Sequence, residues 1–302
     1  MKTLLKEYPD LFSFSKNHAV FANGNTMLFI SKDCVWKNKF STTFYRDPYT
    51  DVKISAINTN EKYVAVGTNF MDGKLYIFTD KGKKLWEQQF ATIASLGWRP
   101  EDVTNVSIGK DVVAVTTQFM HDYVYVFTLG RYRLFERRFD EDIINVFAGE
   151  NIVVTTEDRV FVFNRQGKLI LEDEGKVNCV FEHSGKLVFC GDVKNSKNSI
   201  YCDFAGECGN YIYAVDGNML KILDEKFGEL WSFEASSNIV KVMCDNSKIY
   251  VMCDGEIFIF WKDKLIWNAE FQGRAIGICR IGAFYYNNGL NIMPFEKCLS
   301  TN

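Results

Sequence analysis

The sequence predicts an all-β fold built of repeated units, on two observations. A Trp or Phe followed four residues later by a Phe recurs along the chain, and each copy closes a stretch of short alternating strands. Turns such as Thr79-Asp-Lys-Gly82 and Asn164-Arg-Gln-Gly167 come before the last strand of a unit. The copies are Trp36-Lys-Asn-Lys-Phe40, Trp86-Glu-Gln-Gln-Phe90, Phe135-Glu-Arg-Arg-Phe139 and Trp267-Asn-Ala-Glu-Phe271. Repetition at a period of a few tens of residues is typical of stacked supersecondary units, and all-β units predict a β-propeller.

The unit at residues 53–90 shows the plan most clearly. Its second strand is a continuous apolar run, as in an inner strand packed on both faces, whereas its fourth alternates like a solvated outer strand. The strands, called a to d from the centre outward, are Lys53–Ile57, Tyr63–Gly67, Lys74–Phe78 and Lys84–Phe90. Further units are predicted at 11–40, 103–139, 143–173 and 238–271.

The number of blades depends on an irregular region at 177–235. Residues 199–235 alone form a full unit, with strands at Ile200–Phe204, Tyr211–Val215, Leu220–Leu223 and Leu230–Phe233. This leaves an extra hairpin, Val177–Phe181 with Leu187–Cys190, as a truncated blade or an insertion. The C-terminal segment offers three strands, Ala275–Cys279, Ala283–Tyr286 and Leu290–Phe295. We expect seven blades, with eight as the alternative, and a ring closed by the N-terminal strand Lys2–Tyr8, which removes an open edge.

Composition places few limits on function. No Pro/Ser-rich linker divides the 302 residues, so a single domain over residues 1–302 is expected. A hydrophobic content of 47% is enough for a sizeable core, and a net charge of −3 argues against a generally basic nucleic-acid binder. The N-terminus lacks a signal-like apolar run, no stretch is long enough for a transmembrane helix, and the nine cysteines show no CxxC pair. We therefore expect reduced, buried thiols in a cytoplasmic protein with no membrane insertion.

The c–turn–d run carries a resemblance to known families. Leu75-Tyr-Ile-Phe-Thr-Asp-Lys-Gly-Lys-Lys-Leu-Trp86 is similar to the repeat of quinoprotein-like propellers, and Leu220-Lys-Ile-Leu-Asp-Glu-Lys-Phe-Gly-Glu-Leu-Trp231 matches almost as well. The overall plan resembles WD-repeat propellers, although no Trp-Asp pair ends a third strand. The resemblance implies a propeller over essentially the whole chain, and such folds host many functions.

Aromatic residues are concentrated in loops predicted for one face. The d–a and b–c loops open on one face, called the top, and the a–b and c–d loops on the other, called the bottom. Top loops at 41–50 and 91–101 are unusually long, and two matching b–c loops occur at 69–73 and 118–122. Aromatic residues, Met and Arg are enriched at interface centres, so these loops predict a partner site; the alternative is that they pack on one another. The candidates are Phe44, Tyr45, Arg46, Tyr49, Phe70, Met71, Trp98, Arg99, Phe119 and Met120.

Charge is also expected to differ between the faces. Top loops contain more acidic than basic residues, including Asp140-Glu-Asp142, whereas bottom loops contain Lys81, Lys83, Lys84, Arg131 and Arg133. Such a distribution can orient partners electrostatically. The alternative is ordinary solvated turns, in which charged residues are common.

Three functional hypotheses follow. The first is a non-enzymatic scaffold or complex subunit that docks one or more proteins through the top-face loops. The second is a module for RNA or a ribonucleoprotein that uses the basic bottom residues, a nucleic-acid role that is possible but not favoured. The third is a small-ligand binder or quinoprotein-like enzyme using the channel mouth, although strand a sequences such as Val177–Phe181 are mostly apolar. The three histidines are scattered, and no catalytic, metal or cofactor residues can be named.

Overall fold

The computed structural model describes residues 5–41, 52–69, 72–94, 97–245 and 247–295, and every structural statement below concerns these residues. They form strands joined by turns, and none of them forms a helix long and apolar enough to cross a membrane. The chain divides into two compact units, Pro9–Lys176 and Val177–Asn302 with Met1–Tyr8. The strands form seven sheets of three to six strands and one separate hairpin. The predicted fold class, an all-β propeller with seven blades, is confirmed.

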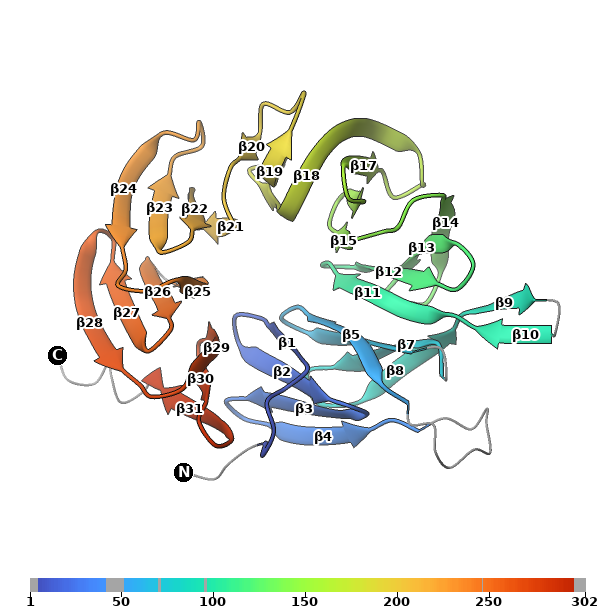
Figure 1. The fold of residues 1–302 in the computed structure, drawn as a ribbon, viewed down its shortest axis with the longest axis horizontal. Helices are drawn as coiled ribbons and strands as arrows, with labels where there is room; N and C mark the ends of the chain where they lie inside the picture. Colours follow the sequence, from blue (N-terminus) through green and yellow to red (C-terminus); the bar gives the residue numbers. More distant parts are fainter. Residues whose placement is uncertain (1–4, 42–51, 70–71, 95–96, 246, 296–302) are drawn as a thin grey trace. The chain divides into compact units, whose positions relative to one another are not determined.

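The unit Pro9–Lys176 contains three four-stranded antiparallel sheets and the first strands of a fourth (Figure 1). The first sheet is β1 (Leu11–Phe14), β2 (His18–Asn23), β3 (Thr26–Ser31) and β4 (Val35–Lys39). The second is β5 (Ile54–Thr59), β6 (Tyr63–Thr68), β7 (Lys74–Thr79) and β8 (Lys84–Gln89). The third is β11 (Asp102–Ile108), β12 (Val112–Gln118), β13 (Asp122–Thr128) and β14 (Arg133–Phe139). The innermost strands β1, β5 and β11 of successive sheets lie next to each other.

The fourth sheet has six strands and contains the extra hairpin predicted at 177–190. Its strands are β15 (Asn145–Ala148), β16 (Ile152–Thr155), β17 (Arg159–Phe163), β18 (Leu169–His183), β19 (Lys186–Val193) and β20 (Ser199–Ile200). The boundary between the two units falls within β18, which continues from the outer strand of one meander into the hairpin with β19. The truncated unit is therefore continuous with the preceding blade.

The second unit continues with three sheets. They are β21 (Phe204–Cys208), β22 (Tyr211–Asp216), β23 (Met219–Leu223) and β24 (Glu229–Glu234), then β25 (Ile239–Asp245), β26 (Lys248–Cys253), β27 (Glu256–Trp261) and β28 (Lys264–Glu270). The last has β29 (Arg274–Cys279), β30 (Gly282–Tyr286) and β31 (Leu290–Pro294), as predicted. Residues 1–4 of the expected closing strand lie outside the described residues, and residues 5–8 are not a strand. They nevertheless lie against the last sheet, because the amide of Leu290 donates to the carbonyl of Leu5 at 2.8 Å and Tyr286 to that of Lys6 at 2.9 Å.

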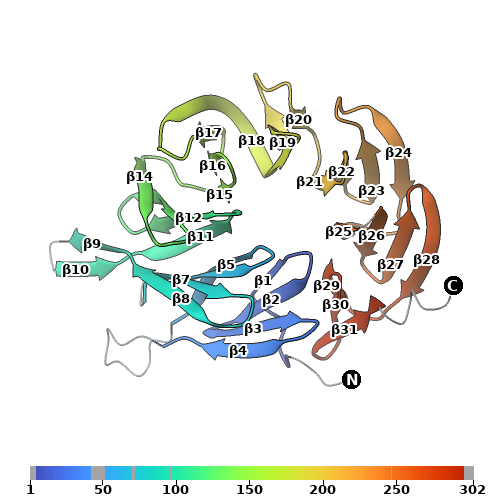
Figure 2. The same ribbon diagram turned by 180° about the vertical axis from the view of Figure 1, so that it is seen from behind.

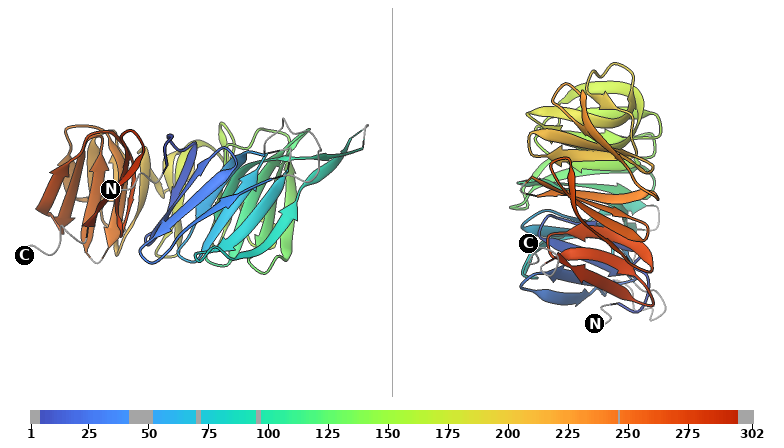
Figure 3. Two further views of the ribbon diagram at one scale, coloured as in Figure 1. Left: turned by 90° about the horizontal axis from the view of Figure 1, so that it is seen from below. Right: turned by 90° about the vertical axis from the view of Figure 1, so that its left-hand side faces the viewer.

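Two predicted segments differ in the structure. The first strand of the 199–235 unit lies at Phe204–Cys208, not at 200–204, because Cys208 pairs with Tyr211 across a tight Gly209-Asn210 turn. Gly209 has φ of 67°, the left-handed conformation that such turns require. The segment 91–100, predicted as a loop, is a hairpin of β9 (Ala91–Ala94) and β10 (Gly97–Pro100). Figures 2 and 3 show it extending beyond the sheets of its unit.

The repeated aromatic pattern packs each sheet against the next. Side chains four residues apart on a strand point to the same face. In the first three copies both rings contact the following sheet, and in the fourth Phe271 does. Trp86 lies 6.0 Å from Phe127 between ring centroids, and Phe90 lies 4.8 Å from Tyr125. The equivalent contacts are Trp36 with Phe78, Phe40 with Tyr76, Phe135 with Phe163, Phe139 with Phe161, and Phe271 with Tyr285. The prediction that these rings pack between neighbouring blades is confirmed.

The turn glycines belong to the same arrangement. Gly82 has φ of 79°, and a Cβ there would lie 2.9 Å from the Trp36 ring. Gly167 has φ of 77°, and a Cβ there would lie 2.7 Å from Phe135. At these two c–d turns the glycine therefore both allows the left-handed backbone and leaves room for the aromatic ring of the preceding sheet.

The cysteines differ from the expectation of reduced thiols. Cys179–Cys190 and Cys208–Cys244 form disulfides, while Cys34, Cys202 and Cys253 are free thiols. Cys208 is the last residue of β21 and Cys244 the last but one of β25, the innermost strands of successive sheets. Across its own hairpin Cys244 lies opposite Ile249, so its disulfide partner comes from a different sheet. The spacing of cysteines along the sequence does not reveal pairing between sheets.

A buried histidine in the first sheet makes stability depend on pH. His18 is 1% exposed, and the Thr59 hydroxyl donates to the Tyr63 carbonyl at 2.9 Å while lying 2.5 Å from His18 Nε2. The Thr59 oxygen therefore accepts the Nε2–H of a neutral imidazole. Burial lowers the pKa of His18 to about 4, although the charge of Asp80 acts to raise it.

Between pH 6.5 and 4 the unfolded chain binds a proton at His18 that the folded chain does not, so the free energy of unfolding falls as pH falls. We expect this one group to account for a loss of up to about 3 kcal/mol over that window. Urea unfolding at pH 7 and pH 4.5 measures it: His18→Gln should flatten the pH dependence, and the exposed-site control His121→Gln should not. Equal pH dependence in the wild type and His18→Gln would contradict the assignment.

Candidate interaction surface

Many of the predicted top-face residues lie outside the described part of the chain. These are Phe44, Tyr45, Arg46, Tyr49, Phe70 and Met71. Trp98 and Arg99 lie on β10, where Trp98 pairs with Ile93 in the backbone register; the Trp98 side chain is not described. The structure therefore places only part of the predicted surface, centred on the turn between β12 and β13.

The β12–β13 turn presents two exposed apolar side chains. Gln118 pairs with Asp122, which closes a loop of three residues that lie outside the ladder. Phe119 is 43% exposed and Met120 is 66% exposed. These two residues follow the fully buried β12 run Val112–Thr117, so the change from core to surface occurs within the turn itself.

A buried carboxylate fixes this turn to the next loop. Asp122 is 6% exposed, and its Oδ2 accepts the backbone N–H of Ile143 at 2.7 Å. Ile143 is itself buried and follows the acidic segment Asp140–Asp142. The turn bearing Phe119 and Met120 is therefore linked to the acidic β14–β15 loop by a charge-assisted hydrogen bond, which is stronger than a neutral one.

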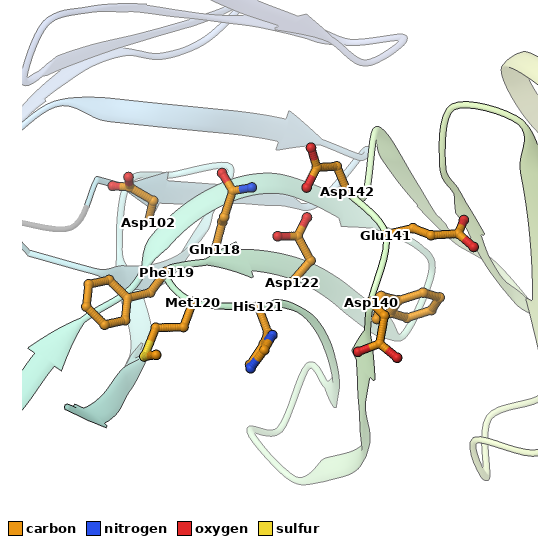
Figure 4. A pocket seen from close by; sticks show the side chains of 10 residues that line it. Asp102, Gln118, Phe119, Met120, His121, Asp122, Asp140, Glu141 and Asp142 are labelled. Atoms are coloured by element: carbon orange, nitrogen blue, oxygen red, sulfur yellow. The ribbon is translucent and has the colours of Figure 1, made fainter. Parts of the chain in front are cut away.

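Between these two loops lies a cavity of about 470 Å³, which we call the acidic groove (Figure 4). Phe119 and Met120 lie at one end, Asp140 and Glu141 at the other, and Asp122 between them. A second cavity of about 490 Å³ on the other side of the turn is lined in part by Ala91 and Thr92 of β9. The acidic groove is lined by Asp102, Gln118, Phe119, Met120, His121, Asp122, Phe139, Asp140, Glu141 and Asp142.

The groove is strongly negative. Five of its lining residues are carboxylates and none is Lys or Arg. Two of the carboxylates are partly compensated by arginines of β14 and β17, Asp140 by Arg138 at 3.1 Å and Glu141 by Arg159 at 3.2 Å. Asp142 is exposed and has no ion pair with any described residue. In the described chain no three His, Cys, Asp or Glu side chains come together in a way that could hold a metal ion.

The basic residues predicted for the other face also lie in neighbouring turns, but two of them form ion pairs with carboxylates of their own strands. Trp86 Nε1 donates to the Leu129 carbonyl at 2.7 Å, which brings the β7–β8 turn next to the β13–β14 turn. Lys84 pairs with Glu87 and Arg133 with Glu136, each at 2.6 Å. Lys81, Lys83 and Arg131 are exposed in these turns.

Sequence reasoning identified both sides of the groove but did not connect them. It predicted an aromatic turn and an acidic loop as separate features of the top face. Their contact depends on Asp122, whose burial has no signal in a polar turn sequence. The equivalent position in the second sheet is also a buried aspartate, Asp72, which is 2% exposed; the matching Met-Asp and His-Asp turn ends were the available hint.

The sequence matches no family model and no curated protein. Three solved structures are similar in fold. BamB from Moraxella catarrhalis is 11% identical, with a TM-score of 0.59 over 96% of this chain and 95% of that chain. A crystal structure of a mitotic checkpoint complex contains a chain 10% identical, with a TM-score of 0.52 over 96% and 92%.

The third structure is KlHsv2 with loop 6CD replaced by a Gly-Ser linker, 13% identical, with a TM-score of 0.55 over 78% of this chain and 89% of that chain. At such low identities the similarity shows the fold alone. The chain has a WD-repeat-like β-propeller fold.

Proposed function

We propose that this protein is a non-enzymatic complex subunit that docks a partner protein at the acidic groove. The observation that carries the proposal is the pair Phe119 and Met120, exposed side by side on a turn that the Asp122–Ile143 hydrogen bond fixes beside a cavity. Phe and Met are enriched at interface centres, where well-packed pockets provide most of the binding energy. One similar structure is a mitotic checkpoint complex, which is consistent with a role in an assembly.

A pull-down from nuclease-treated native lysate tests this function. The double variant Phe119→Ala/Met120→Ala should lose a stoichiometric protein partner that the wild type captures, because truncating an interface centre typically costs about 2 kcal/mol or more per key residue. Tyr132→Ala is the matched control, since Tyr132 is 78% exposed in the β13–β14 turn on the predicted bottom face.

Retention of the partner by the groove variant would contradict the proposal. Capture of nucleic acid when nuclease is omitted, lost on Lys83→Glu/Arg131→Glu, would favour the anionic-partner hypothesis. That hypothesis also predicts a steep fall in affinity with salt, because phosphate contacts release counterions.

The cytoplasmic location predicted from the sequence stays a prediction. Disulfides are rare in the cytosol and common in oxidising compartments. Alkylation of the protein in intact cells, followed by mass analysis, would show whether Cys208 and Cys244 are bonded there. Free thiols at both would agree with the cytoplasm, and a bonded pair would place the protein in an oxidising compartment.

A further inference from the structure

Resting on the proposed function, we infer the chemistry of the partner segment: a short basic peptide stretch in which Lys or Arg side chains flank one large apolar side chain. The apolar side chain packs on Phe119 and Met120, and the cationic groups lie along the carboxylates of the acidic groove. The class of partner is therefore a protein with an exposed, positively charged segment.

The distribution of charge supports a cationic occupant. The carboxylates Asp140, Glu141 and Asp142 form one end of the groove, and Arg138 and Arg159 reach the first two from strands β14 and β17. Arg159 also pairs with Glu172 at 3.2 Å, so its single charge is shared between two carboxylates. The groove therefore keeps a net negative charge after its internal ion pairs are counted, and Asp142 contributes one unit that no described cation balances.

The apolar end of the acidic groove indicates that its occupant carries an apolar group as well as positive charge. Phe119 and Met120 together expose an aromatic face and a flexible thioether, which adapts to irregular apolar surfaces. An aromatic face also attracts Lys or Arg groups through cation–π contacts. A segment that combines an apolar side chain with neighbouring positive charges therefore satisfies both ends at once.

The size of the groove accommodates part of a peptide segment. About 470 Å³ lies within the range of cavities that hold small ligands, roughly 300–1,000 Å³. That volume holds a few side chains, and the cavity of about 490 Å³ beyond the turn extends the surface toward β9. Acidic peptides and nucleic acid are disfavoured here, since like charges brought together at an interface cost binding free energy.

The test is a selection of random 12-residue displayed peptides on the immobilised full-length protein. We expect enriched peptides to carry Lys or Arg around a Leu, Ile, Met or aromatic residue. The double variant Asp140→Asn/Asp142→Asn changes two exposed side chains, so the fold should be kept. A selected peptide is then synthesised. At 50 mM salt this double variant should bind the peptide about three- to tenfold more weakly than the wild-type protein does, as expected for two exposed ion pairs.

Controls separate this inference from the proposed function. Asp263→Asn, an exposed carboxylate in the β27–β28 turn, should leave the affinity unchanged, and the effect of Asp140→Asn/Asp142→Asn should shrink at 500 mM salt. Enrichment of neutral or acidic peptides, no enrichment at all, or equal affinity of the Asp140→Asn/Asp142→Asn variant would overturn the inference. The pull-down with Phe119→Ala/Met120→Ala is read separately from these outcomes. If that variant fails to capture the lysate partner, the docking function stands, and only the basic character of the partner segment is wrong.

Discussion

Replacing Phe90 with alanine is expected to lower the free energy of unfolding by about 3–5 kcal/mol, the range for a buried aromatic residue truncated to alanine. Phe90 is 4% exposed, and its ring packs on Tyr125 and Phe127 of the next sheet. The substitution removes this aromatic contact between two sheets and leaves a cavity that the strands cannot close, because backbone hydrogen bonds hold Phe90 to Gly73 and Glu101. Urea unfolding measures the loss, provided that the dependence of the free energy of unfolding on urea concentration is the same in the variant and the wild type.

Phe119→Ala is the matched control, because Phe119 is the same residue type but is 43% exposed. Its effect should stay within about 0.5 kcal/mol, as is usual at the surface. A loss at Phe119 as large as that at Phe90 would contradict the assignment of Phe90 to the packing between sheets and of Phe119 to the surface.

Replacing Asp72 with alanine is expected to lower the free energy of unfolding by up to about 3 kcal/mol, because it leaves the buried Tyr76 hydroxyl without its acceptor. The Thr68 hydroxyl keeps the Lys74 carbonyl as an acceptor at 3.2 Å. The Asp72 carboxylate accepts from Tyr76 at 2.5 Å and from Thr68 at 3.0 Å, and Lys74 lies 3.5 Å away. Burial raises the pKa of the Tyr76 phenol well above its ordinary value, and the hydrogen bond to Asp72 adds to this, so the phenol stays a donor.

A double-mutant cycle isolates the buried contact. Tyr76→Phe removes the phenol that Asp72→Ala leaves unpaired, so the double variant should recover about 1 kcal/mol relative to additivity. Asp140→Ala, with a side chain 88% exposed, should change stability by less than about 0.5 kcal/mol. Additive effects of Asp72→Ala and Tyr76→Phe would show that the hydrogen bond does not stabilise the second sheet.

The repeated aromatic pattern could be read from the sequence because its physical cause is local. A Trp or Phe and a Phe four residues on share a strand face, and alternation identifies the strand that carries them. The same reasoning found β5 to β8 within two residues of their observed ends. It failed at Phe204–Cys208, where the two-residue Gly209-Asn210 turn sets the register, and at 91–100, where a hairpin lacks a clear apolar alternation.

The groove could be predicted only in part, because it depends on tertiary contacts. Exposure of Phe119 and Met120 follows from their place in a three-residue turn, and the acidic character of 140–142 is visible in the sequence. The turn and the acidic loop lie close together because the buried Asp122 carboxylate accepts the Ile143 amide. No local sequence pattern encodes this contact. The disulfide Cys208–Cys244 was missed for the same reason, since it joins strands of different sheets.

The most direct test of the docking account is site-specific photo-crosslinking in cells that make the protein. A benzophenone amino acid replaces Met120 in one variant and Tyr132 in the other; both side chains are exposed, at 66% and 78%, in turns predicted for opposite faces. The account predicts one discrete protein adduct from position 120 and none of that mass from position 132. The same adduct from position 132, with none from position 120, would contradict docking at the acidic groove.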